Sequence, residues 1–201
     1  GCGAADMAVV CISERANCLR DLGRLDEAAR VYGQAISLAE QRHNERSVAV
    51  SKSRLGTVRL QQRRFPEALA AWRDARERFE ALGEAVTVAV AWHQIGMVHQ
   101  HAGHGNDAED AYHQSLAIRV QCNDVAGQAA TLLQLGNLYD DILGRPEDAV
   151  THYRQAAERR VALRDVANEG HARNNLANTL RCLGRIQEAR REIERAIECK
   201  R

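Results

Sequence analysis

The chain has 201 residues, of which 45% are hydrophobic and only 4% are aromatic, and its formal net charge is +1. The near balance of 28 basic and 27 acidic side chains gives no electrostatic reason to expect nucleic acid or an anionic membrane as a partner. No apolar stretch is long enough to cross a bilayer, and two prolines in the whole chain favour helix nearly everywhere.

A short signature recurs along the chain at intervals of about forty residues. It consists of a small residue, an acidic residue followed by alanine, an aromatic residue and a second small residue. The fourth copy has one extra residue, near 140–143. Such a period is typical of stacked helical hairpins, none of which can bury its apolar face alone. The copies start at Ala16, Gly56, Gly96, Gly136 and Ala177, and their aromatic positions hold Tyr32, Trp72, Tyr112, Tyr153 and, in the fifth copy, Ile193.

Each copy is predicted to form two antiparallel helices. The sequence thus predicts an all-α fold, a right-handed superhelical solenoid of five helix pairs that forms a single array over 1–201. The first helices are expected at 5–22, 45–62, 85–102, 125–143 and 166–183, and the second helices at 25–42, 65–82, 105–122, 146–163 and 186–200. The repeats then span 5–42, 45–82, 85–122, 125–163 and 166–200.

The turns within the hairpins follow a common pattern. Four of them carry a glycine, which takes the left-handed conformation of a helix end without a Cβ penalty. The second repeat has Arg63 at that place, so we expect its turn to close differently. The small residues Gly56 and Ala68 let two helices approach, and Trp72 is expected to fill the space between successive hairpins. The extra residue near 140–143 predicts a bulge or a wider turn.

The run Leu135-Gly136-Asn137-Leu138-Tyr139, followed by Ala149, Tyr153 and Ala156, resembles the tetratricopeptide repeat family. The forty-residue period is similar to that of its long-repeat members, such as the Leu-Gly-Asn-repeat adaptors and kinesin light chain. The resemblance covers essentially the whole chain. HEAT-type repeats have a comparable length but lack this pattern of small and aromatic residues.

The resemblance implies that a peptide or protein segment binds in the concave groove lined by the first helices. Some long-repeat relatives use a row of asparagines there, because a carboxamide offers both a donor and an acceptor to an extended backbone. Here the row is interrupted by Thr57 and Met97. Instead of binding a partner, its asparagines could form hydrogen bonds within the helix stack or face water. The predicted peptide-binding residues are Asn17, Arg20, Thr57, His93, Met97, Gln100, Asn137, Asp140, Asn174, Asn178 and Arg181, the last three of which could together hold a carboxylate.

No arrangement of residues in the sequence predicts catalysis, and no cofactor is expected. His101 and His104 have the spacing of helical metal ligands, but no third ligand is evident, and exposed groove histidines are the preferred interpretation. His93 and His101 could still make binding sensitive to pH. The six cysteines are predicted to be reduced, small buried residues.

We therefore expect a cytoplasmic, non-catalytic module whose partner is a protein or peptide segment, with neither nucleic acid nor membrane involved. The predominance of arginine over lysine suggests a bacterial coding sequence. Because both ends fall within predicted helices, we expect a fragment of a larger protein, or ends covered by self-association. A structural scaffold that forms a homo-oligomer through its repeat ends or edges is the alternative function.

Overall fold

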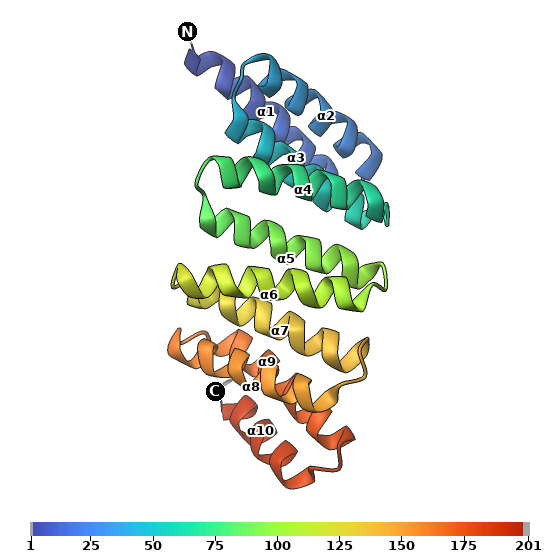
Figure 1. Cartoon of the computed structure of the whole chain (residues 1–201), viewed down its shortest axis with the longest axis vertical. Coiled ribbons are helices and arrows are strands. Elements are labelled where there is room, and N and C mark those ends of the chain that lie inside the picture. Colours follow the sequence, from blue (N-terminus) through green and yellow to red (C-terminus); the bar gives the residue numbers. More distant parts are fainter. Residues whose placement is uncertain (1, 199–201) are drawn as a thin grey trace. The chain divides into compact units, whose positions relative to one another are not determined.

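The computed structural model describes residues 2–198, with side chains from 7 to 197. Over that range it contains ten α-helices and no strand (Figure 1). The predicted boundaries agree with the observed ones to within three residues, and the fold is the predicted all-α solenoid of helix pairs. The helices are α1 (Cys2–Asp21), α2 (Leu25–Gln41), α3 (Glu45–Gln61), α4 (Phe65–Ala81), α5 (Ala85–His101), α6 (Gly105–Gln121), α7 (Val125–Asp141), α8 (Pro146–Ala162), α9 (Val166–Cys182) and α10 (Ile186–Glu198).

The chain divides into two compact units. The first unit comprises residues 1–102 and the second comprises residues 103–201. In the first unit each of the helices α1 to α5 packs against the next one along the chain, and in the second unit α6 to α10 do the same. Within each unit, contacts between the helices of one hairpin therefore alternate with contacts between successive hairpins, as expected of stacked repeats.

Small residues set the close approach of the two helices in a hairpin. A Cβ atom at Gly56 would lie 2.6 Å from Cδ1 of Trp72, and a Cβ atom at Gly136 would lie 2.4 Å from Cε1 of Tyr153. Each ring thus lies against the glycine of its own hairpin. Trp72 therefore packs within its own hairpin, and its expected place between successive hairpins stays a prediction.

The turn at Arg63 closes in the same way as the glycine turns, so the sequence expectation for it was wrong. Arg63 has a φ of 58°, in the left-handed region, as Gly23 does with a φ of 74°. The Arg63 N–H donates to the Leu60 carbonyl at 2.9 Å, and the Gly23 N–H donates to the Arg20 carbonyl at the same distance. The hydrogen bonds of the helix end hold an L-residue in a conformation that costs about 1–2 kcal/mol.

Replacing Arg63 with glycine should therefore stabilise the chain. We expect a gain of about 0.5–1 kcal/mol, because relief of the left-handed strain is partly offset by the larger unfolded-state entropy of glycine. Urea denaturation followed by circular dichroism would measure it. The reverse change, Gly23→Arg, should destabilise by a similar amount, and a destabilised Arg63→Gly variant would contradict the strain argument.

The extra residue of the fourth repeat lies in the turn, and α7 has 17 residues, as α3, α5 and α9 do. This turn spans 142–145, four residues where the other hairpin turns have three. Leu143 packs on Gly105 of α6, where a Cβ atom would lie 2.7 Å from Leu143 Cδ2. The position of Gly105 holds an apolar side chain in the other repeats, Phe65 among them. The wider turn thus fills a space that Gly105 leaves empty.

The cysteines whose side chains the structure describes are not buried, contrary to the sequence prediction. The four whose surroundings are described have no disulfide partner among the described residues and are exposed to solvent. They lie at outward-facing or terminal positions of their helices, where the repeat pattern does not require an apolar side chain. These residues are Cys11, Cys18, Cys122 and Cys182, while the side chains of Cys2 and Cys199 lie outside the described residues.

Candidate functional site

Two of the row asparagines bond within the helix stack. The Tyr32 hydroxyl donates to Asn17 Oδ1 at 2.5 Å, and the Tyr153 hydroxyl donates to Asn137 Oδ1 at 2.8 Å. Asn137 Oδ1 also accepts a bond from Asn175 Nδ2 at 3.2 Å. These carboxamides therefore orient the aromatic ring of their own hairpin, which is the alternative that the sequence left open.

Other predicted groove residues have partners as well. The Thr57 hydroxyl donates to the backbone carbonyl of Ser53 at 3.2 Å. The Arg20 guanidinium bonds the neighbouring Asp21 carboxylate through Nε at 3.0 Å and Nη2 at 2.8 Å. Asp140 Oδ2 accepts a bond from the Thr179 hydroxyl at 2.7 Å, which connects α7 to α9. These side chains stabilise the repeats in the structure, and a role in binding a partner remains a prediction for them.

The sequence interpretation expected exposed histidines on α5, but two of the three are buried. His93 is 9% exposed and His99 is 7% exposed, whereas His101 is exposed. His104 Nδ1 lies 3.9 Å from Asp107 Oδ2, and the two residues have the same three-residue separation as the Arg24–Glu27 pair of the first hairpin turn. Burial of His93 leaves little of its side chain accessible to a partner. Gln100 and Met97 of the same helix are partly exposed.

One stripe of α9 differs from the rest of the predicted site. Asn174, Asn178 and Arg181 are exposed, and none of the three side chains bonds another described residue. Their spacing of four and three residues places them on the same face of the helix. We call these three residues the α9 stripe. Its carboxamides and guanidinium are available to a ligand without breaking an internal contact.

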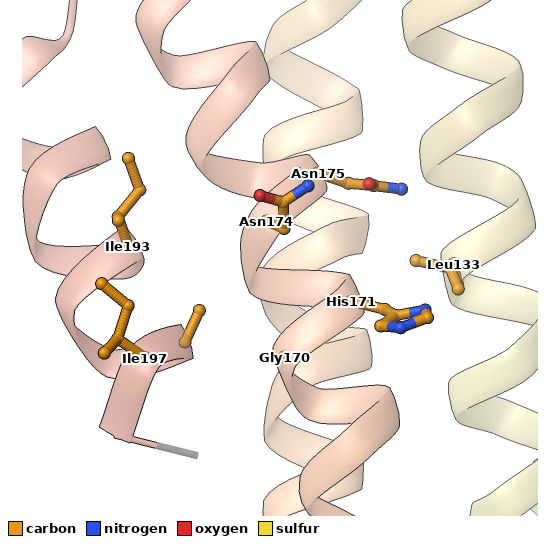
Figure 2. Close-up of a pocket in the computed structure, with 8 residues that line it drawn as sticks. Leu133, Gly170, His171, Asn174, Asn175, Ile193 and Ile197 are labelled. Carbon is orange, nitrogen blue, oxygen red and sulfur yellow. The ribbon is translucent and has the colours of Figure 1, made fainter. Parts of the chain in front are cut away.

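A hollow of about 410 Å³ adjoins the α9 stripe (Figure 2). Asn174 and His171 of α9 lie between Leu133 of α7 on one side and Ile193 and Ile197 of α10 on the other. Gly170 and Ala196 form part of the lining, and Asn175 completes it. The surface therefore combines an apolar wall with polar groups that can donate and accept.

Two residue choices of the fifth repeat explain this hollow. Ile193 stands where the other repeats have a tyrosine or tryptophan, and Gly170 stands where three earlier repeats have a buried alanine, Ala129 among them. Among the described residues, a Cβ atom at Gly170 would meet only the Ala196 carbonyl oxygen, at 3.8 Å. The side-chain volume removed at both positions leaves the space unfilled. Ile193 and Ile197 remain 44% and 51% exposed.

The sequence analysis missed a buried arginine between α6 and α7. Arg119 is 7% exposed and donates from Nη1 to Asp124 Oδ2 at 2.9 Å and from Nε to the Ser115 hydroxyl at 3.1 Å. Gln128 Nε2 donates to the Arg119 carbonyl at 3.1 Å. Burial lowers the pKa of the Arg119 guanidinium, against the effect of the Asp124 carboxylate. The signal in the sequence is Gly127, since a Cβ atom there would overlap the guanidinium.

A second cluster that the sequence did not predict surrounds Tyr139 in the second unit. The Tyr139 hydroxyl donates to Glu109 Oε1 at 2.5 Å, and Arg145 lies over the Tyr139 ring, 4.6 Å from its centre. Burial, followed by the hydrogen bond that the hydroxyl donates to Glu109, raises the pKa of the Tyr139 phenol. His152 lies 4.9 Å from the same ring, and burial lowers the pKa of its imidazole. His113 is also near, with Nε2 3.3 Å from the hydroxyl.

The lowered pKa of His152 predicts a loss of stability in mild acid. The unfolded chain takes up the proton near the ordinary histidine pKa of about 6.5, above the pKa in the folded state, so stability falls as the pH decreases through that range. We expect a lower melting temperature at pH 5.5 than at pH 7.5, and a smaller decrease in His152→Gln. The exposed His171→Gln serves as the control, and an unchanged decrease in His152→Gln would contradict the prediction.

None of the described helices is long and apolar enough to span a membrane.

Comparison with solved structures shows the fold. The crystal structure of BtubC (BKLC) from P. vanneervenii is similar over 94% of this chain and 78% of its own, with a TM-score of 0.84 and 20% sequence identity. A putative kinesin light chain of Podosopora anserina with nearly identical TPR-like repeats has a TM-score of 0.78 and 17% identity, covering 96% and 95%. The apo form of RapI has a TM-score of 0.84 and 15% identity, covering 94% of this chain and 52% of that one.

A search of curated protein sequences finds no match. The family model for the tetratricopeptide repeat matches residues 8–82, 87–162 and 142–201, which together include most of the chain. The repeat period, the helix pairs and the similar structures agree with this match. The chain belongs to the tetratricopeptide repeat family.

Proposed function

We propose that this chain is a non-catalytic module that binds a segment of a partner protein on the surface formed by its first helices. Repeats of this family generally mediate protein–protein interactions. The observation that carries the proposal is the α9 stripe, Asn174, Asn178 and Arg181, exposed and without a bond to a described side chain. Other polar first-helix residues, such as Asn137 and Asp140, already have partners.

The chemistry of the stripe suits an extended peptide with a carboxylate. The two asparagines can each donate to a carbonyl and accept from an N–H of the peptide backbone. Arg181 can bind a carboxylate with two parallel hydrogen bonds. From residue 174 to residue 181 the helix rises about 10 Å, which matches about three residues of extended chain. The hollow in Figure 2, with Ile193 and Ile197 in its wall, can accept an apolar side chain beside that backbone.

A displayed library of random 12-residue peptides, selected against the whole chain, tests this function. Peptides that bind are synthesised, and their affinities are measured for Asn174→Ala, Asn178→Ala and Arg181→Ala. We expect each change to weaken binding about threefold to thirtyfold, the range for one lost hydrogen bond to a neutral or charged group. Arg159→Ala, an exposed arginine of α8, is the matched control. Selected peptides whose affinity is unaffected by all three changes would exclude the stripe as the site.

Self-association is the second candidate function, because α10 exposes three isoleucines to solvent. Ile186, Ile193 and Ile197 are 55%, 44% and 51% exposed. Burying these side chains against a second copy would remove apolar surface from water. Light scattering over a range of concentrations should then show a mass that rises with concentration and that Ile197→Glu returns to the monomer value. A constant monomer mass would exclude this function.

A further inference from the structure

A second hollow, of about 460 Å³, lies in the first unit between α3 and α5, at the end where α4 begins. Its volume is in the range of pockets that hold small ligands or single side chains. We call it the α3–α5 hollow. It is lined by Thr57, Leu60, Gln61, Arg63, Phe65, Gln94, Met97 and His101.

The floor of the α3–α5 hollow is apolar where other repeats are polar. Met97 occupies the row position that holds Asn137 in the fourth repeat, and Leu60 occupies the position that holds Asp140. Phe65, at the start of α4, completes an apolar surface made of side chains from three helices. The residues that interrupt the asparagine row thus create a place for an apolar side chain.

The rim of this hollow is polar and carries positive charge. Arg63 is exposed, forms no ion pair with a described acid, and its guanidinium lies 6.0 Å from the centre of the Phe65 ring. The described residues of the lining include no acidic side chain. By contrast, the adjacent Arg64 is held by Glu67 at 2.6 Å. The rim therefore has an arginine whose charge is not neutralised by a neighbouring carboxylate.

The backbone supplies an independent observation about Arg63. The residue is held at a φ of 58°, and the equivalent position is glycine in the other four repeats, for example Gly23. Strained residues of this kind concentrate at sites of function. Turns between hairpins also hold left-handed residues other than glycine, such as Arg164, so what distinguishes Arg63 is the comparison with the glycines of the other hairpin turns. An arginine in place of that glycine, with no described acid as partner at the edge of a hollow, fits a binding role.

We propose that the α3–α5 hollow binds a partner segment in which a leucine or phenylalanine is followed directly by acidic residues. The apolar side chain enters between Leu60, Phe65 and Met97, and the carboxylate bonds the Arg63 guanidinium at the rim. This site rests on the proposed function in requiring a protein partner, but its residues belong to the first unit and are independent of the α9 stripe.

Labelled 12-residue peptides of glycine and serine test the site directly with the whole chain. They carry leucine or phenylalanine at the sixth position, followed by two glutamates, two glutamines or two lysines. Fluorescence anisotropy at low salt should give binding about tenfold tighter for the glutamate peptides than for the glutamine peptides, and weaker binding still for the lysine peptides.

Arg63→Gly is the decisive variant, because it is expected to make the chain more stable while removing the rim charge. Its affinity for the glutamate peptides should fall about tenfold, and a thermal melt would show that the loss is not due to unfolding. Met97→Asn should weaken all peptides, while Arg42→Ala, an exposed arginine of the same unit, should have no effect.

Two results would overturn the inference. One is equal affinity of the wild-type chain for glutamate and glutamine peptides, which would exclude recognition of a carboxylate. The other is unchanged binding of the glutamate peptides by Arg63→Gly. If Arg181→Ala abolishes that binding instead, the acidic peptides bind at the α9 stripe, so that the hollow is excluded as their site and the proposed function stands.

Discussion

Replacing Asp124 with alanine is expected to destabilise the second unit by about 3–5 kcal/mol, the cost of leaving a buried charge without its partner. Arg119 is 7% exposed, and Asp124 Oδ2 lies 2.9 Å from its Nη1. Asp124 Oδ1 also accepts a bond from the Gly127 N–H at 2.9 Å, which caps α7. The substitution therefore removes a charge partner and a helix cap together. Urea denaturation followed by circular dichroism would measure the loss.

Asp165→Ala is the matched control for this prediction. Asp165 holds the equivalent position before α9, where it accepts a bond from Arg160 at 2.7 Å and one from the Asn168 N–H at 3.3 Å. Its partner Arg160 has 15% of its side chain exposed, against 8% for Arg119, so we expect a smaller loss. Adding Arg119→Met to Asp124→Ala should recover much of the stability, because the unpaired charge is then gone. Equal losses for the two aspartates would show that capping alone accounts for the effect.

Replacing a helical glycine with alanine is expected to lower the free energy of unfolding at position 136 and to raise it at position 170. Gly136→Ala should destabilise by about 1–3 kcal/mol, because the new methyl group would lie 2.4 Å from the Tyr153 ring. The ring cannot move freely, since its hydroxyl is bonded to Asn137. Gly170→Ala should stabilise by about 0.5–1 kcal/mol, because the methyl group would make an ordinary contact with the Ala196 carbonyl oxygen at 3.8 Å and alanine favours helix.

Chemical denaturation of both variants under identical conditions gives the comparison. Adding Tyr153→Ile to Gly136→Ala reproduces the alanine and isoleucine found at positions 177 and 193, and should remove the overlap between methyl group and ring. The first repeat holds Ala16 together with Tyr32, both fully buried, so a hairpin can accommodate the pair at some adjustment of its helices. Gly136→Ala at or above wild-type stability would show that such an adjustment costs little here.

Much of the fold follows from the sequence, because the repeat is a local property. The forty-residue period, the small residues and the turn glycines predicted every helix to within a few residues, since helix formation and capping depend on neighbouring residues in the chain. Arg63 was the exception. At Arg63 the hydrogen bonds of the helix end compete with the cost of a left-handed φ. The turn keeps the hydrogen bonds and accepts the strain, an outcome that the amino-acid composition does not predict.

The sequence by itself determined which residues lie on the first-helix face, because periodicity fixes the direction of each side chain around its helix. Only the tertiary structure decided which of these side chains are left without a hydrogen-bond partner among the described residues. Asn137 bonds Tyr153 across a hairpin, while Asn178, at the equivalent position, has Ile193 there and no hydroxyl to bind. A hydrogen bond depends on the atoms that packing brings within about 3 Å, and those atoms come from distant parts of the chain.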